Sequence, residues 1–157
     1  MARILIDMQA CQTESRFRGL GRYTDALARA IAAQAGADEI HLLVNSAFPE
    51  TLAAIRQEFD PLVGAGNIHV VDLLDQCEDR APRLRWRHHA SALLREAYID
   101  MIAPDVVFCP SFFEGYIDPA VLSIGRLASV PVVTTVHDFI PLVYRQDYLD
   151  KTPDFRR

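Results

Sequence analysis

Short apolar runs alternate with longer amphipathic stretches along most of this chain. The short runs are nearly continuous in apolar character and rich in β-branched residues, which is typical of strands in a parallel sheet covered on both faces. We therefore expect five buried strands, at residues 3–7, 39–44, 68–71, 106–109 and 130–136.

Apolar residues at helical spacing fill the gaps between the first four expected strands. The three helices are expected to begin near Gly21, at Pro49 and near Arg83. Gly36 supplies a stop for the first helix, and Pro104 ends the third, because proline cannot continue helical hydrogen bonding. In the third helix the apolar residues step by three and four, at positions 90, 93, 94, 97 and 101.

A weaker helix is expected between the fourth and fifth strands, over 119–127. The resulting order, β-α-β-α-β-α-β-α-β, predicts an α/β fold with right-handed crossovers. This is a doubly wound, mostly parallel Rossmann-like sheet with helices on both faces. The length of 157 residues fits one ordinary domain. We assign residues 1–145 to that domain and residues 146–157, which carry no strong pattern, to a tail.

The overall charge and the cysteines exclude several protein classes. The formal net charge is -5, which argues against a general nucleic-acid binder, since such domains are usually basic. Cys11, Cys77 and Cys109 are odd in number and far apart, so they indicate neither a disulfide framework nor a zinc site. We expect inert thiols in a reducing compartment. The first apolar run is too short for a secretory signal, and no run reaches the roughly 20 apolar residues that a membrane span needs, which together predict a cytoplasmic protein.

Ligands of open α/β sheets bind beyond the carboxyl ends of the strands, and the loop after the first strand is long and polar. It ends in G-L-G at a helix start, where Gly19 and Gly21 would allow a ligand close to the backbone and to unpaired N–H groups. Arg16, Arg18 and Arg22 add positive charge. The alternative is a plain turn with solvated arginines. The glycines match neither a dinucleotide fingerprint nor a P-loop.

His137 and Asp138 follow the fifth strand directly. A histidine and a carboxylate at a strand end can carry protons or orient a polar substrate. The alternative is that Asp138 caps the next turn and His137 is a hydrogen-bonded wall residue.

Glu114 lies among aromatic residues in the loop after the fourth strand, P-S-F-F-E-G-Y. Aromatic rings beside a carboxylate suit carbohydrate, because rings pack on sugar C–H faces and the carboxylate binds hydroxyls. Aromatic residues are also ordinary packing material, so both interpretations stay open here.

A basic and aromatic cluster lies at the start of the third helix, where cations oppose the helix dipole. This placement is compatible with contact to anionic lipid or phosphate, but a solvated face is the preferred interpretation of the cluster. The cluster comprises Arg80, Arg83, Arg85, Trp86, Arg87, His88 and His89.

Two segments resemble the amino-terminal hallmarks of family-four retaining glycosyltransferases, and in particular bacterial enzymes that build polysaccharides, often with mannose. The first is I-L-I-D-M-Q-A-C-Q-T-E-S-R-F-R-G-L-G-R-Y, and the second is V-V-T-T-V-H-D-F-I-P-L. The intervening C-P-S-F-F-E-G-Y is also similar, so the resemblance covers essentially the whole chain.

The resemblance implies a GT-B fold in which the amino-terminal domain binds the acceptor and a carboxyl-terminal domain binds the nucleotide sugar. Gly19 and Gly21 would approach the donor phosphates, and His137 would lie near the transferred sugar. Arg18, Arg22 and Tyr23 would contact acceptor or phosphate, and Asp138 would orient His137 or cap its loop. From its aromatic surroundings, we also count Glu114 among the residues expected to bind acceptor or phosphate. The reaction implied is retaining transfer of a hexose, for which we expect GDP-mannose as donor, no metal or other cofactor, and a polysaccharide or lipid-linked glycan as acceptor.

The chain also departs from that family. The resemblance implies a whole enzyme about twice as long as this chain, with a glutamate pair, E-x7-E, in the second domain. Glu50 and Glu58 have this spacing but lie on an expected surface helix, so we interpret the match as coincidence. We expect residues 146–157 to lead toward that second domain, the chain alone to be inactive, and contact with the inner face of the membrane. The alternatives are a self-sufficient nucleotide- or sugar-binding module and a non-catalytic interaction domain.

Overall fold

The computed structural model describes residues 1–76, 82–112, 114–115, 117–125, 129–148 and 150. The strands are β1 (Arg3–Asp7), β2 (Glu39–Asn45), β3 (Ile68–Val71), β4 (Val106–Cys109) and β5 (Val132–Thr134). The α-helices are α1 (Gly19–Gln34), α2 (Pro49–Val63), α3 (Arg85–Ile102), α4 (Ile140–Val143) and α5 (Arg145–Tyr148). Short 3-10 helices are η1 (Gln9–Cys11), η2 (Glu14–Phe17), η3 (Ala65–Asn67) and η4 (Pro82–Leu84).

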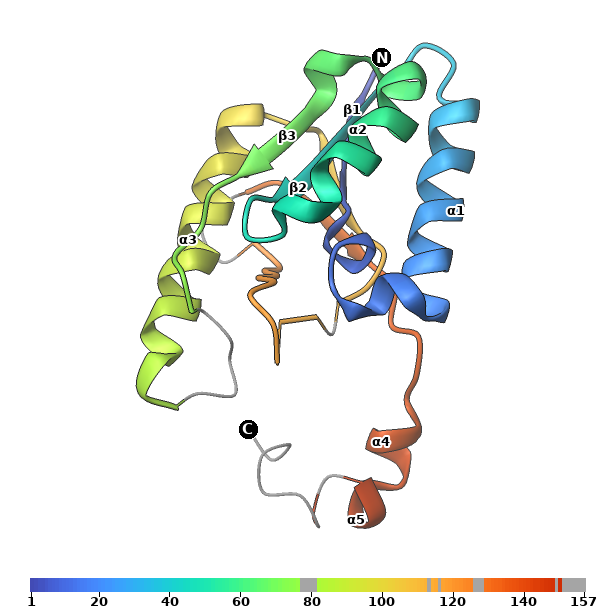
Figure 1. Ribbon diagram of the computed structural model, residues 1–157. Coiled ribbons are helices and arrows are strands. Elements are labelled where there is room, and N and C mark those ends of the chain that lie inside the picture. The colour runs from blue at the N-terminus through green and yellow to red at the C-terminus, as the bar shows by residue number, and fades with distance from the viewer. Residues whose placement is uncertain (77–81, 113, 116, 126–128, 149, 151–157) are drawn as a thin grey trace.

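All five strands run parallel in one sheet with the order β3-β2-β1-β4-β5 (Figure 1). The central strand β1 pairs with β2 on one side and with β4 on the other, so that Leu5 lies opposite both His41 and Val107. The chain first builds outward from β1 to β3 and then returns to the other side of β1. This topology confirms the predicted parallel Rossmann-like sheet and places its switch point at the carboxyl ends of β1 and β4.

Successive residues of β1 point to opposite faces of the sheet and enter two separate cores. Ile6 packs with Ala28 of α1 and Phe59 of α2 in the core on one face. Leu5 packs with Ile99 of α3 in the core on the other face. Helices therefore cover both faces, as the doubly wound prediction requires.

Helix α3 buries a mostly polar side and exposes its large apolar side chains. Its buried residues are mostly polar or charged, namely Ser91, Arg95, Glu96 and Ile99. Large apolar side chains lie exposed on it, with exposed fractions from 45% at Leu93 to 81% at Met101. Trp86 and Leu94 are exposed as well. The predicted step of three and four residues is helical, but it marks a surface that neighbouring parts of the described chain leave open.

The expected helix over 119–127 is wrong for its described part, because residues 119–125 form no helix. Side chains from elsewhere hold the backbone of this segment. Gln9 bonds both backbone groups of Val121, and Asn45 donates to the Pro119 carbonyl. These bonds take up backbone groups that a helix would pair internally. Positions 126 and 127 lie outside the described residues.

The other boundaries differ only at their ends. β5 is shorter than the expected strand at 130–136, and α1 begins at Gly19, two residues early. α3 ends at a left-handed Ala103 just before Pro104, as expected. Of the tail, the structure describes α5 up to Tyr148 and then Asp150, whereas positions 149 and 151–157 lie outside the described residues.

The membrane and thiol expectations can be compared with the described residues. Within these ranges no helix has both the length and the apolar character that a membrane crossing requires. Cys109 is buried and Cys11 half-buried, and both are free thiols. Burial raises the pKa of Cys11 to about 12 and that of Cys109 to about 11, so both thiols stay protonated at neutral pH, as expected for inert cysteines. Cys77 lies outside the described residues.

Candidate functional site

The loops after β1, β4 and β5 meet at the carboxyl edge of the sheet. Tyr23, near the start of α1, contacts His137 edge to face, with ring centroids 4.8 Å apart and an interplanar angle of 88°. The Nε2 atom of His137 lies 2.7 Å from the Pro110 carbonyl oxygen. The structure thus brings together two predicted site residues that are far apart in the sequence, beside the β1–β4 switch point.

The contact with Pro110 fixes the tautomer of His137. A carbonyl oxygen only accepts, so Nε2 carries the proton and donates it to this bond. In the neutral ring Nδ1 is then the acceptor, and the side chain is exposed. His137 can therefore accept a hydrogen bond from a ligand hydroxyl while its ring is held from the other side.

Asp138 turns toward the backbone that follows it. Its Oδ1 accepts from the Ile140 N–H at 2.6 Å and closes an Asx turn over the start of α4. Of the two roles considered for Asp138, capping its loop is the one that has a hydrogen bond in the structure. A direct catalytic role for this carboxylate stays a prediction.

Glu114 joins the loops after β1 and β4. Its Oε2 accepts from the hydroxyls of Thr13 at 2.8 Å and Ser15 at 3.0 Å, and its Oε1 accepts from Ser111 at 2.8 Å. In the structure the carboxylate thus binds hydroxyls of the protein itself. Its contact with a ligand stays a prediction. The neighbouring aromatic residues Phe113 and Tyr116 lie outside the described residues.

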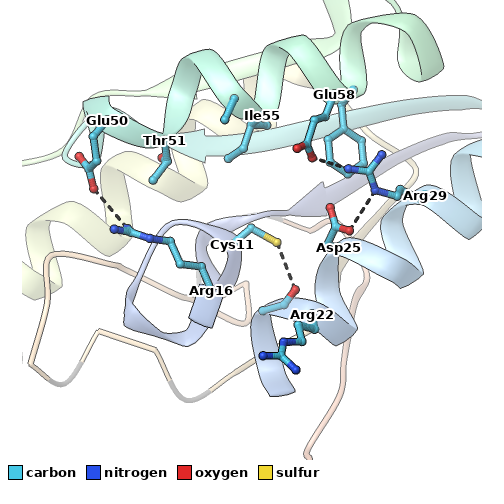
Figure 2. Close-up of a pocket in the computed structure, with 12 residues that line it drawn as sticks. Cys11, Arg16, Arg22, Asp25, Arg29, Glu50, Thr51, Ile55 and Glu58 are labelled. Atoms are coloured by element: carbon cyan, nitrogen blue, oxygen red, sulfur yellow. Dashed lines mark hydrogen bonds and ion pairs between the residues drawn. The ribbon is translucent and has the colours of Figure 1, made fainter. Parts of the chain in front are cut away.

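The two glycines of the first loop have different surroundings. A Cβ on Gly21 would lie 2.4 Å from the Cα of Arg16, whereas a Cβ on Gly19 would meet nothing within 4 Å. Gly21 is therefore needed for the close approach of η2 to α1. Arg18 is extended and exposed just before the helix, and Arg22 is exposed beside a groove between α1 and α2 (Figure 2).

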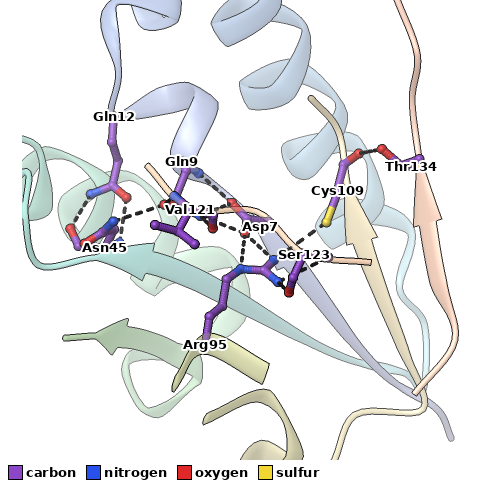
Figure 3. Close-up of polar contacts among 9 residues, drawn as sticks. All are labelled: Asp7, Gln9, Gln12, Asn45, Arg95, Cys109, Val121, Ser123 and Thr134. Atoms are coloured by element: carbon purple, nitrogen blue, oxygen red, sulfur yellow. Dashed lines mark hydrogen bonds and ion pairs between the residues drawn. The ribbon is translucent and has the colours of Figure 1, made fainter. Parts of the chain in front are cut away.

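A buried ion pair lies beneath this edge (Figure 3). Arg95 contacts Asp7 Oδ2 through Nη2 at 2.6 Å and through Nε at 3.2 Å, and both side chains are 1% exposed. Nη1 of Arg95 also donates to Ser123 Oγ at 2.9 Å. Burial disfavours the charged guanidinium, but the carboxylate of Asp7 outweighs this effect and raises the pKa of Arg95.

Three buried amide side chains continue this network toward β2. Gln9 donates to the Val121 carbonyl at 2.8 Å and accepts from the Val121 N–H at 3.0 Å. Gln12 makes the same two-sided contact with the backbone of Asn45, at 3.0 and 2.7 Å. Asn45 donates to Gln9 at 3.1 Å. Together they hold the loop after β1 and segment 119–123 in place.

Sequence reasoning missed these positioning residues. The available signals were Asp7 at the end of an apolar strand and the polar glutamines that follow it. Arg95 gave a weaker signal, because an arginine in an amphipathic helix is ordinarily exposed. Among the described residues, no group of three histidine, cysteine, aspartate or glutamate side chains is arranged to hold a metal ion.

Comparison with known proteins gives one consistent relationship. The chain is 35% identical over 156 residues to the serotype-specific mannosyltransferase WbdA of Escherichia coli, which covers 98% of this chain and 18% of the relative. Two further WbdA proteins of Escherichia coli are 30% and 29% identical over 133 residues, or 83% of this chain and 16% of each relative. No family model and no solved structure matches the chain.

The chain thus spans less than a fifth of the length of these curated relatives. The alignment covers 98% of this chain and therefore includes both segments on which the resemblance is based. This similarity over almost the whole chain confirms the predicted resemblance to mannosyltransferase-like glycosyltransferases.

Proposed function

We propose that the chain forms the amino-terminal, acceptor-binding domain of a retaining glycosyltransferase with the GT-B fold. The enzyme transfers mannose from GDP-mannose to a polysaccharide or lipid-linked glycan. The similarity to WbdA supports mannosyl transfer. The contact between Tyr23 and His137 at the carboxyl edge of the sheet is the observation that carries the site assignment.

His137 is suited to contact the transferred sugar. Its Nε2 is engaged by Pro110, and its Nδ1 is left to accept from a sugar hydroxyl. An oriented polar group at this place steadies charge that develops on the sugar ring in the transition state. Tyr23 packs against the imidazole ring of His137 and limits the orientations of that side chain.

The amino terminus of α1 is suited to approach the donor phosphates. The first turn of a helix has unpaired N–H groups and the positive end of the helix dipole. Gly19 begins this 16-residue helix, and the exposed Arg18 directly precedes it. The remaining donor contacts come from a second domain in this proposal.

Substitution of His137 tests the proposal in the full-length protein. His137→Ala is expected to lower mannose transfer by more than about tenfold while donor affinity stays nearly unchanged, because the lost contact belongs to the reacting centre. Phe139→Ala, at an exposed position in the same loop, is the matched control. Turnover of His137→Ala at the wild-type rate would remove His137 from the site.

The outward face of α3 is the surface that we propose to contact the cytoplasmic face of an anionic membrane. It exposes the apolar side chains of Trp86, Leu93, Leu94 and Met101. Arg87 lies over the Trp86 ring at 5.3 Å, and Arg83 is exposed in the turn just before the helix. Aromatic and leucine side chains beside arginines are typical of surfaces that lie in the membrane interface. Arg80 of the predicted basic cluster lies outside the described residues.

Vesicle sedimentation tests this contact. The protein is expected to bind vesicles rich in anionic lipid and to bind neutral vesicles weakly, since basic residues near the surface contribute about 1 kcal/mol each. Leu93→Ser should weaken binding severalfold. Leu62→Ser, at a similarly exposed leucine on α2, should leave it unchanged. Equal binding by both variants would exclude α3 as the contact.

A further inference from the structure

A groove with a volume of about 520 Å³ lies between α1 and α2 (Figure 2). Arg22 lines the groove, whereas the next residue, Tyr23, contacts His137. Consecutive helical residues point about 100° apart. The groove therefore adjoins the proposed transfer site, on another side of the first turns of α1.

The floor of the groove is uncharged. Ile55 contributes apolar surface, whereas the ring of Phe59 is 1% exposed and lies beneath the guanidinium of Arg29, whose Cζ is 4.8 Å from the ring centroid. The Cys11 thiol donates to the Gly21 carbonyl oxygen at 3.5 Å, and burial raises the pKa of this thiol to about 12. The floor is thus apolar and neutral at physiological pH.

The walls carry as many positive as negative charges. An ion pair stands at each end, with Arg16 and Glu50 3.3 Å apart at one end and Arg29 and Asp25 2.9 Å apart at the other. Arg29 also pairs with Glu58 across the groove. The lining residues with full charges are Arg16, Arg22, Arg29, Asp25, Glu50 and Glu58. Because these charges cancel, the groove favours neither an anion nor a cation.

We infer that this groove binds the sugar residues of a neutral glycan acceptor that precede the terminal, reacting sugar. This inference rests on the proposed function. Guanidinium and carboxylate groups offer many donors and acceptors, and each ion pair uses only some of them. The remaining donors and acceptors suit hydroxyls, while the apolar side chains of Ala54 and Ile55 that line the groove suit sugar C–H faces. From Glu50 to Glu58 along α2 the groove runs for about 12 Å, at about 1.5 Å per residue, which accommodates more than one pyranose ring.

A purely structural contact between α1 and α2 does not require this open space. Where two helices pack together for stability, interdigitated side chains fill the space between them. Exposed ion pairs contribute only about 0–1 kcal/mol each, and the wall residues here are partly exposed. The polar walls and open volume are better explained by a ligand.

Filling the groove tests the inference. Ala54 lines the groove at an exposed position of α2, and Ala53 is exposed beside it without lining the groove. Ala54→Trp should block the groove, and Ala53→Trp is the matched control. Binding of α-linked mannose oligomers of increasing length would be measured on this chain by calorimetry, with circular dichroism as a check of folding.

The wild-type chain is expected to bind the longer oligomers at least about tenfold more tightly than mannose itself, or about 1.4 kcal/mol. Ala54→Trp should lose this gain, and Ala53→Trp should retain it. If Ala54→Trp does not fold, Glu50→Gln combined with Glu58→Gln takes its place and should reduce the gain severalfold. The inference would be overturned if the groove variants still bound longer oligomers more tightly than mannose. It would also be overturned if the affinity of the wild-type chain did not increase with oligomer length. Neither result would bear on the proposed function, because mannose transfer by the full-length protein is tested independently with His137→Ala.

Discussion

The two faces of the sheet are covered in opposite ways. On one face, α1 and α2 bury apolar side chains such as Ala28, Ile55 and Phe59 against the strands. On the other face, α3 buries Arg95 and Glu96 and exposes its leucines. The first face is stabilised mainly by packing and the second also by a polar network. The comparison teaches that helical periodicity identifies a helix but does not by itself decide which side faces the core.

The buried ion pair should dominate the stability of the α3 face. Arg95→Ala is expected to lower the free energy of unfolding by about 3–5 kcal/mol, because it leaves the Asp7 carboxylate buried without its partner. Denaturant titration would measure this loss. The double variant Asp7→Val with Arg95→Met should be less destabilised than Arg95→Ala, since no charge is then left unpaired. A loss below about 0.5 kcal/mol for Arg95→Ala, the range of ordinary surface substitutions, would contradict the account of this face.

The α3 face should also make stability depend on pH. The rings of His41 and His69 stack 5.1 Å apart, and burial lowers the pKa of both, with Arg3 lowering that of His41 further and His41 lowering that of His69. Above the ordinary histidine pKa of about 6.5 both rings are neutral in either state and the folded form is fully stable. As the pH falls below this value, the unfolded chain takes up protons first and stability is lost down to the lowered folded pKa.

Unfolding measured between pH 7.5 and 5 would test this expectation. His69→Gln should flatten the pH dependence in that range, because it removes one of the two titrating rings and the neighbour of the other. An unchanged slope in His69→Gln would show that other groups cause the dependence.

The smallest effect is expected on the outward side of α3. Leu94→Ser should change the free energy of unfolding by less than about 0.5 kcal/mol, because this leucine is 47% exposed. Ile55→Ala on the opposite face should cost about 2–5 kcal/mol. Calorimetric melting of both variants would sharpen the comparison. A large loss for Leu94→Ser would mean that the apolar stripe of α3 serves stability.

The sequence predicts well those elements whose residue pattern is confined to a short stretch of the chain. The strands at Arg3–Asp7, Ile68–Val71 and Val106–Cys109 were predicted with the bounds that the structure has, because apolar β-branched runs are readable within a few residues. The edge of the sheet that carries His137 followed from the parallel topology alone.

The parts that were missed depend on contacts between distant residues. Segment 119–125 is held by Gln9 and Asn45, and Arg95 is held by Asp7, which lies 88 positions earlier. Such contacts leave no periodic pattern in the sequence. The contact between Tyr23 and His137 likewise cannot be predicted from spacing, although Tyr23 is a candidate by resemblance and His137 both by resemblance and by its place after a strand.

The most direct test of the central claim is a calorimetric titration of this chain with GDP-mannose, UDP-glucose, NAD and a simple mannoside. An acceptor-binding domain should bind the mannoside and bind the nucleotides weakly or not at all, because the proposed function assigns the donor site mainly to a second domain. Nucleotide binding with a micromolar Kd, about -8 kcal/mol, would contradict the account and show that this chain holds a complete nucleotide site.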